Sequence, residues 1–369
     1  MSSRFPPPTG ASKSTLAPSL DQAGRPLRDL RLSVTDRCNF RCRYCMPRDR
    51  VDASGFLPRA SILSFEEMAR AARASVQLGV QKIRVTGGEP LLRRDLVRLI
   101  EMLSALSSDQ MRSSDAPLDL ALTTNGVLLP HFAAPLKAAG LGRITVSLDA
   151  IDERVFQRMS DAPAFGSADV LRGIDAALQA GFGPVKVNCV VRRGVNEAEV
   201  KRIARHFLGT GCVVRFIEFM DVGTRNGWTS GEVFSEQEMT QQLRELGSLT
   251  PLPPSQVGEV SHRYLLQAAD GRRLEVGVIA SVTAPFCGDC CRARLSADGR
   301  LFTCLFASQG HSIFQLLRQQ RPDAELVDAL RLVWQGRTDR YSEQRSSITG
   351  PRGPFRLPVM KVEMSTIGG

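Results

Sequence analysis

Short apolar runs alternate with longer amphipathic stretches along most of this 369-residue chain, and this alternation constrains the fold more than any other feature. Runs rich in β-branched residues predict strands at 30–34, 82–86, 118–123, 143–148, 185–191 and 213–219. Apolar residues at helical spacing predict helices between them, at 65–78, 96–106, 132–139, 170–180 and 200–208. A strand that alternates with a helix in this way belongs to a parallel sheet, because the helix carries the chain back to the starting edge.

Polar or glycine residues lie within two positions of the ends of most of these predicted strands, as Gly87, Asn125, Asp149 and Asp221 do. In α/β barrels the functional groups collect at the carboxyl ends of the strands and on the loops that follow. A doubly wound sheet would instead gather them at one switch point in the strand order. We therefore predict an incomplete, TIM-like (β/α)6 barrel for residues 28–225.

The remaining segments predict a leader and a smaller second domain. Residues 1–27 are rich in Pro, Ser and Gly without periodicity, which is typical of a disordered segment. Residues 226–369 predict a C-terminal α+β domain with short antiparallel strands at 272–280 and 295–305, where Asp298-Gly299 is a hairpin signal. Helices are expected in this domain at 311–320 and 324–335.

Composition narrows the class of partner. The net charge of +10 and the pI near 9.5 favour an anionic partner, either nucleic acid or a polyphosphate metabolite. The basic residues form no long run and aromatic residues make up only 6% of the chain, so a base-stacking platform for nucleic acid is not expected. No apolar run approaches the roughly 18 residues that span a membrane. We predict a cytoplasmic protein, monomeric or homodimeric, with neither nucleic acid nor membrane as partner.

The nine cysteines point to metal or redox chemistry rather than to disulfides, because the chain begins with no export signal. Cys38-x3-Cys42-x2-Cys45 lies in the loop after the first predicted strand. Three thiolates at this spacing can hold an iron–sulfur cluster and leave one iron open to another molecule. A structural zinc site is the alternative, but zinc takes a fourth ligand and the nearest histidine in the sequence is His131.

A second cysteine group lies near the end of the chain. Cys287-x2-Cys290-x13-Cys304 again offers three thiolates, which predicts a second cluster with an open iron for a substrate. Cys291 is a competing ligand, but adjacent cysteines rarely both reach one cluster well. We favour the widely spaced set and leave structural zinc or a passive electron relay as alternatives.

Basic residues on the predicted strands indicate a site for a triphosphate. Arg292 and Arg294 alternate and so emerge on one face of a strand, as do Lys82 and Arg84. Charged side chains inside a barrel are costly unless an anion pairs with them. Other predicted strands carry three further charged residues of this kind, namely Arg31, Lys186 and Arg215. Guanidinium groups can bind phosphate oxygens in a bidentate manner, which suits this array.

Two motifs resemble the radical SAM superfamily, whose members cleave S-adenosylmethionine (SAM) on a three-cysteine 4Fe–4S cluster. These are the first cysteine group and Gly87-Gly88-Glu89-Pro90, where glycines permit close approach of a ligand to the backbone. A closer resemblance, to the GTP 3′,8-cyclase family of molybdenum cofactor biosynthesis, covers most of the chain from residue 28. Its segments lie at 31–47, 82–92, 123–126, 146–150, 215–223 and 287–296, with the terminal Gly368-Gly369.

This resemblance implies a reaction and a set of cofactors. A 5′-deoxyadenosyl radical removes H3′ of GTP, and the C3′ radical attacks C8 of guanine to give (8S)-3′,8-cyclo-7,8-dihydroguanosine 5′-triphosphate. The implied cofactors are SAM and two 4Fe–4S clusters, each with three cysteine ligands, and the cofactors rather than a catalytic side chain carry the chemistry. The implied partners are GTP, a reductant protein such as flavodoxin or ferredoxin, and cyclic pyranopterin monophosphate synthase, which takes the product.

The resemblance also implies roles for individual residues. The expected SAM contacts are Tyr44, Gly88, Ser147 and Met220. The expected GTP contacts are Arg31, Arg84, Thr123, Lys186, Arg292, Ala293 and Arg294, with Lys82 and Arg215 in support. The tail Gly368-Gly369 is expected to reach the active site between the clusters.

Two other classes of protein remain as alternatives. A radical SAM enzyme that modifies peptides would also carry extra clusters, although such enzymes generally need more cysteines than the C-terminal half offers. A basic iron–sulfur protein that binds RNA and relays electrons would leave the Gly-Gly-Glu-Pro motif and the open iron unexplained.

Overall fold

Alternating burial along the parallel strands explains why the predicted barrel forms. In β5 (Lys186–Val191) the residues Val187, Cys189 and Val191 are buried, whereas Lys186 and Asn188 are only half-buried. Successive side chains of a strand point to opposite faces of the sheet. One face of β5 therefore packs in the apolar core under the helices, and the other carries polar groups into the interior of the barrel.

The computed structural model describes residues 18–46, 55–106, 117–224, 226–256, 258–349 and 361–368. Its other strands are β1 (Asp29–Ser33), β2 (Lys82–Thr86), β3 (Asp119–Thr124), β4 (Arg143–Ser147), β6 (Val213–Glu218), β7 (Ser248–Leu252), β8 (His262–Gln267), β9 (Arg273–Ile279), β10 (Arg292–Leu295), β11 (Arg300–Phe302) and β12 (His311–Ser312). Its helices are α2 (Phe65–Gln77), α3 (Leu96–Ala105), α4 (Leu129–Ala138), α5 (Glu153–Ser160), α6 (Ser167–Gln179), α7 (Glu199–Phe207), α8 (Glu236–Arg244), α9 (Phe314–Arg318), α10 (Asp323–Gln335), α11 (Tyr341–Thr349) and α12 (Met364–Ile367).

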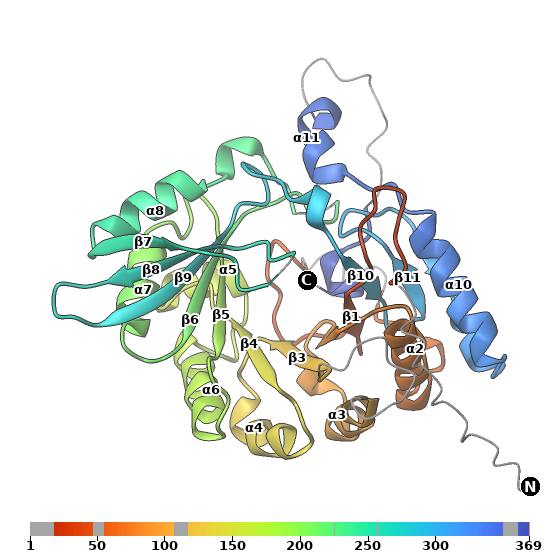
Figure 1. Cartoon of the computed structure of the whole chain (residues 1–369). Helices are drawn as coiled ribbons and strands as arrows, with labels where there is room; N and C mark the ends of the chain where they lie inside the picture. The colour runs from red at the N-terminus through yellow and green to blue at the C-terminus, as the bar shows by residue number, and fades with distance from the viewer. Residues whose placement is uncertain are drawn as a thin grey trace, which may run out of the picture.

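The strands join in one sheet of order β12-β11-β10-β1-β2-β3-β4-β5-β6-β9-β8-β7. Strands β1 to β6 are parallel neighbours in chain order, as the sequence predicts. Figure 1 shows this sheet curving around a central space, with α3, α4, α6 and α7 outside it and the C-terminal end of the chain within. This is the predicted incomplete barrel with its carboxyl-end loops gathered around one interior.

The C-terminal segments extend the barrel sheet at both of its edges. β9 pairs in parallel with β6, and β10 pairs in parallel with β1. The strand expected at 272–280 is therefore β9, which is antiparallel only to β8. The hairpin at Asp298-Gly299 is present between β10 and β11, although β10 begins earlier than expected, at Arg292.

Two local features differ from what the sequence predicts. Sequence periodicity did not predict the β7–β8 hairpin, whose residues are mostly exposed or half-buried and so lack a regular apolar pattern. The helix expected at 311–320 is divided into the short strand β12 and the five-residue helix α9. Among the described residues no helix is long and apolar enough to cross a membrane.

Part of the expected leader is ordered. Residues 1–17 lie outside the described part, but residues 18–27 pack against the C-terminal segments. Asp21 is buried and accepts hydrogen bonds from the side chains of Arg25 (2.6 Å) and Arg337 (3.3 Å). Trp334 donates its indole N–H to the carbonyl of Arg25 (3.0 Å). These charged and aromatic anchors order a stretch whose Pro and Gly content alone predicts disorder.

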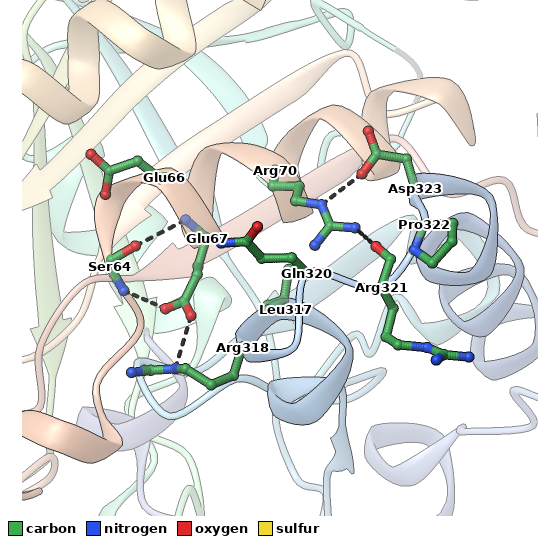
Figure 2. A pocket seen from close by; sticks show the side chains of 10 residues that line it. All are labelled: Ser64, Glu66, Glu67, Arg70, Leu317, Arg318, Gln320, Arg321, Pro322 and Asp323. Carbon is green, nitrogen blue, oxygen red and sulfur yellow. Dashed lines mark hydrogen bonds and ion pairs between the residues drawn. The ribbon is translucent and has the colours of Figure 1, made fainter.

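A surface pocket lies where α2 meets α9 and α10 (Figure 2). The Ser64 hydroxyl and the Glu67 carboxylate cap the start of α2 reciprocally, as in a capping box. Arg70 on α2 pairs with Asp323 (2.6 Å), and Arg318 pairs with Glu67 (2.9 Å). Because these charged side chains already pair with one another, the ion pairs connect the C-terminal helices to the barrel. The pocket is therefore not expected to bind a charged ligand.

Candidate active site

A cavity of about 340 Å³ occupies the interior of the barrel and is lined by side chains from both parts of the chain. Two sets of cysteines reach it, which we name the first triad (Cys38, Cys42 and Cys45) and the second triad (Cys287, Cys290 and Cys304). The other expected site residues that line it are Tyr44, Gly88, Ser147, Met220, Arg31, Lys82, Arg84, Thr123, Lys186, Arg215, Arg292 and Arg294. One space thus brings together residues that the sequence separates by more than two hundred positions.

The first triad is held by the loop that follows β1. The amides of Cys45 and Met46 donate to the carbonyl of Cys42 (2.9 and 2.8 Å), which closes the loop into a tight turn. The amide of Phe40 donates to the sulfur of Cys38 (3.3 Å). Burial raises the pKa of Cys38 to about 12 and that of Cys42 well above its usual value.

The glycines of Gly87-Gly88-Glu89-Pro90 allow a second backbone to approach. A Cβ on Gly88 would lie 2.2 Å from the carbonyl oxygen of Arg37, and one on Gly87 would lie 2.4 Å from that of Thr35. The amide of Gly88 donates to the carbonyl oxygen of Thr35, and the amide of Glu89 donates to that of Arg37, each at 2.7 Å. The two glycines therefore pack the loop after β2 against the segment that leads into the first triad.

Buried polar contacts fix the loops after the first strands relative to one another. The Glu89 carboxylate accepts from the Thr124 hydroxyl (2.7 Å) and the Asn125 amide (2.7 Å). The Asn125 side chain donates in turn to that of Asn39 (2.7 Å), inside the first cysteine loop. Burial raises the pKa of Glu89 to about 7, although the three hydrogen bonds that it accepts oppose this shift. Through these contacts, the residues at the ends of β2 and β3 hold the loop that carries the first triad in place.

Tyr44 is oriented by a carboxylate at the end of β4. Its hydroxyl donates to Asp149 (2.7 Å), which also accepts from the amide of Val190 (2.8 Å). Burial raises the pKa of Asp149 to about 6, against the lowering effect of these two hydrogen bonds. The aromatic ring of Tyr44 therefore has a fixed place on the cavity wall beside the cysteines.

The second triad is held by two buried arginines that the sequence analysis did not single out. Arg25 donates to the carbonyl of Cys287 (2.7 Å), and Arg337 donates to that of Cys290 (2.6 Å). Both guanidiniums also contact the carboxylate of Asp21, which links the two arginines that bind the carbonyls of Cys287 and Cys290. Neither arginine lies on a periodic element or in a recognisable motif, so the sequence carries no signal for them.

The cysteines of the second triad differ in electrostatic environment. Burial raises the pKa of Cys290, but Arg292 and Arg337 outweigh it and lower the pKa to about 6. Burial raises the pKa of Cys304 to about 11. Cys291 does not line the cavity, and its sulfur lies 3.3 Å from the position that a Cβ on Gly258 would take. The three widely spaced cysteines therefore face the cavity while Cys291 faces the loop after β7.

Cationic side chains line the strands between the triads. Arg84 donates to the hydroxyls of Thr123 (2.8 Å) and Thr145 (3.1 Å), and Arg215 donates to the Asn188 side chain (2.9 Å). These neutral partners orient the guanidiniums without balancing their charge. Burial lowers the pKa of Arg215 to about 9 and that of Arg294 to about 10, and it lowers the pKa values of Lys82 and Lys186 to about 8.

The residues fit the groups that the resemblance implies. The Nε atoms of Arg31 and Arg294 are buried and find no hydrogen-bond partner within the described part of the chain, as expected where an anion is to bind. Each triad supplies thiol sulfurs, the donors that iron–sulfur clusters take. No group of three His, Cys, Asp or Glu side chains in the described ranges is placed to hold a single metal ion.

The C-terminal tail enters the same region. Met364 lines the cavity and Ile367 is fully buried. Gly368 lies against β1 and β2, where a Cβ would stand 2.3 Å from Thr86 Cγ2 and 3.0 Å from the hydroxyl of Ser33. Its φ of +73° also favours glycine. Gly369 lies outside the described residues.

Two further placements differ from the expected set. Ala293 is buried on the opposite face of β10 from Arg292 and Arg294, because alternate residues point to opposite sides of a strand, and its side chain does not line the cavity. Residues that line the cavity without having been expected include Asp29, Gln256, Glu259 and Asp339. The loop after β7, which supplies Gln256 and Glu259, carries no motif that would have identified them.

Comparisons with known proteins agree with this architecture. The family description Radical SAM superfamily matches residues 32–207, and the description Molybdenum Cofactor Synthesis C matches residues 212–343. The chain is 48% identical to the GTP 3′,8-cyclase of Acidothermus cellulolyticus over 95% of its length and 99% of that protein. It is 50% identical to the GTP 3′,8-cyclase of Xanthomonas axonopodis pv. citri over 96% of its length and 99% of that protein.

A solved structure supports the fold. The crystal structure of Streptococcus suis SuiB bound to S-adenosylmethionine superposes with a TM-score of 0.55 at 12% identity, covering 83% of this chain and 68% of SuiB. The barrel, the first triad and these matches define a radical SAM enzyme, a class that carries a 4Fe–4S cluster and uses SAM. Within that class, the chain belongs to the GTP 3′,8-cyclase family.

Proposed function

We propose that this protein converts GTP to (8S)-3′,8-cyclo-7,8-dihydroguanosine 5′-triphosphate, the first step of molybdenum cofactor biosynthesis. The observation that carries the proposal is the single cavity lined by two cysteine triads and a set of buried cationic side chains. The names of the relatives, which match nearly the whole chain, support the same substrate. The experiment that tests the proposal is anaerobic incubation with SAM, a reductant and GTP.

The two triads would hold different clusters with different tasks. We assign one 4Fe–4S cluster to Cys38, Cys42 and Cys45, and a second to Cys287, Cys290 and Cys304. With three cysteine ligands each, both clusters would have one iron left for another molecule, SAM at the first triad and the guanine base at the second. When bound, SAM and the first cluster supply the 5′-deoxyadenosyl radical that removes H3′ of GTP, after which C3′ bonds to C8 and one electron and one proton complete the product.

Four residues around the first triad are proposed to bind SAM, namely Tyr44, Gly88, Ser147 and Met220. The ring of Tyr44 is fixed by Asp149 and suits a contact with adenine. The amide of Gly88 donates to Thr35 and the carbonyl of Arg37 fills the space where a side chain would lie, so its contact with SAM would come from its remaining backbone atoms. Ser147 ends β4 and Met220 follows β6, and both residues line the cavity.

The cationic residues are proposed to hold the triphosphate of GTP. Arg31 and Arg294 offer buried Nε donors without partners in the described residues, and burial in a low-dielectric cavity strengthens their attraction for phosphate. Thr123 orients Arg84. The remaining members of the proposed set are Lys82, Lys186, Arg215, Arg292 and Ala293, the last through its backbone. The protein therefore positions the ribose of GTP by fixing the phosphates and the base at once.

The tail is proposed to act in cyclisation. Gly368 lies against Ser33 and Thr86 at the carboxyl ends of β1 and β2, close to where the first triad begins. A glycine end is slim enough to enter this crowded space and presents backbone groups there.

The wider proposal follows the family. The protein would be a cytoplasmic enzyme with its barrel in residues 28–225 and its cluster and substrate domain in residues 226–369. A protein such as flavodoxin or ferredoxin would supply it with electrons. Cyclic pyranopterin monophosphate synthase would take the product.

The first prediction tests the activity. The product is an isomer of GTP, so it has the same mass and separates from GTP by chromatography. We expect GTP-dependent formation of this isomer together with 5′-deoxyadenosine. Cys38→Ala should abolish 5′-deoxyadenosine formation while the iron of the second cluster is retained, because the second triad is intact. Normal 5′-deoxyadenosine formation by Cys38→Ala, or no isomer from the unmodified enzyme, would contradict the proposal.

The second prediction concerns pH. Burial holds the pKa of Lys186 at about 8, so its charge is present below that pH and is lost as the pH rises through it. GTP affinity should therefore fall as the pH rises from 7 to 9, and Lys186→Met should weaken binding about tenfold at pH 7, as expected for the loss of one charge-assisted hydrogen bond. The measurement is titration calorimetry with GTP at each pH. Lys137→Met, at an exposed position, serves as control.

The ionisation of GTP itself is common to all variants, so the comparison between them isolates the lysine. The pH dependence should be shallower in Lys186→Met than in Lys137→Met. Identical affinities and identical slopes in the two variants would remove Lys186 from the phosphate site.

The third prediction concerns the ligands of the second cluster. Cys291 points to Gly258 and not to the cavity, so Cys291→Ser should keep the full iron content and the paramagnetic resonance signals of both clusters. Cys304→Ser should lose the second signal. The reverse outcome, with Cys304→Ser harmless and Cys291→Ser depleted in iron, would exchange the two residues in the assignment.

A further inference from the structure

A buried cluster of charged side chains lies directly after β6. Asp221 is buried, and its carboxylate accepts from Arg345 (2.8 Å), from Lys361 (2.7 Å) and from the hydroxyl of Tyr341. Lys361 also donates to the backbone carbonyl of Asp221 (2.9 Å) and to the Tyr341 oxygen (2.6 Å). The cluster joins three segments that are distant in sequence: the loop after β6, helix α11 and the start of the C-terminal tail.

Electrostatics favour the charged form of the central carboxylate. Burial raises the pKa of Asp221, but the hydrogen bonds from Lys361 and Tyr341 and the charge of Arg345 outweigh it, so the pKa lies below its ordinary value. Burial lowers the pKa of Lys361, and Asp221 opposes that shift. A buried ion pair of this kind contributes specificity of position. Removal of the Lys361 charge would leave Asp221 paired with Arg345 but no longer with the tail.

Aromatic contacts connect the cluster to the second triad. The ring of Tyr341 stacks on that of Phe306 with centroids 4.5 Å apart, and Phe306 lies two residues after Cys304. The Lys361 ammonium lies 4.3 Å from the centroid of the Tyr341 ring, and Arg345 lies 5.3 Å from that of Phe306. The position of the tail and the position of the Cys304 segment are thus set by shared side chains.

A second set of contacts fixes the next residues of the tail. The Glu363 carboxylate accepts from the amide (3.2 Å) and the hydroxyl (3.1 Å) of Thr224, and a Cβ on Gly223 would lie 2.1 Å from it. The amide of Val362 donates to the carbonyl of Ala307 (3.0 Å). Beyond these contacts the chain turns through α12 and brings Gly368 against Thr86. Residues 361–363 therefore anchor the tail against the loop after β6 and against the segment that follows Cys304.

We propose that Asp221, Tyr341, Lys361 and Glu363 form a latch that holds the C-terminal tail in the barrel, with Lys361 and Glu363 as positioning residues for the cyclisation step. The inference rests on the proposed function for its catalytic consequence. Its structural consequence, the immobilisation of residues 361–368, can be measured independently of any reaction. The latch couples the loop that carries Met220 to the segment that carries Cys304.

The test compares Lys361→Met, which removes the charge at similar length, with Lys361→Arg, which keeps it. Lys137→Met on the surface is the matched control. On the reconstituted enzymes, hydrogen–deuterium exchange of the peptide that contains residues 361–368 is followed by mass spectrometry. Cyclised product per 5′-deoxyadenosine is measured in parallel. Glu363→Gln provides a second variant in case Lys361→Met does not fold.

We expect faster exchange of this peptide in Lys361→Met, unchanged iron content, and a loss of about tenfold or more in product per 5′-deoxyadenosine, as expected when a charge-assisted contact is lost. Lys361→Arg should retain most of both properties, and Lys137→Met all of them. Unchanged exchange and an unchanged ratio in both Lys361→Met and Glu363→Gln would overturn the latch. If the unmodified enzyme forms no cyclised product, the proposed function fails, and the exchange measurement still decides whether the latch exists.

Discussion

Positive charge buried inside the barrel is the constraint on which the rest of the site depends. Arg84 and Arg215 project from strands in the middle of the sheet, where they meet the neutral oxygens of Thr123, Thr145 and Asn188. Those oxygens are neutral, and carboxylates such as Asp29 and Glu259 offset only part of the positive charge, which is costly to bury without a further anion. A triphosphate bound there would neutralise this buried charge and would be fixed relative to both cysteine triads. In the proposed function, the interior of the sheet would set the position of the substrate, and the loops around it would hold the groups that carry the chemistry.

Much of the barrel and of the site could be predicted from sequence because both depend on local patterns. Alternating apolar residues predict β1 to β6 in order, and the same alternation predicts that Arg292 and Arg294 share a face. The spacing of the first triad places three thiols in one loop, and the structure brings the distant second triad to the same cavity. The alternation rule also shows why the side chain of Ala293 turns away from the cavity.

The remainder depends on contacts between distant segments, which leave no local pattern. Arg25 lies in a stretch whose composition indicates disorder, yet Asp21 and Trp334 order it behind the second triad. Gly87 and Gly88 resemble a ligand-binding loop, and the structure shows that the chain itself makes the close approach. The β7–β8 hairpin has too few buried residues to produce a periodic signal. In each case the decisive partner lies elsewhere in the sequence, so only the folded arrangement identifies it.

The proposed function requires that the cavity holds GTP with its ribose beside SAM at the first triad. The most direct measurement uses GTP carrying deuterium at C3′, incubated anaerobically with the reconstituted enzyme, SAM and a reductant. We expect the 5′-deoxyadenosine formed to contain the deuterium, because the atom removed from C3′ is transferred to the 5′ carbon. Formation of 5′-deoxyadenosine that depends on GTP but carries no deuterium from C3′ would contradict the account.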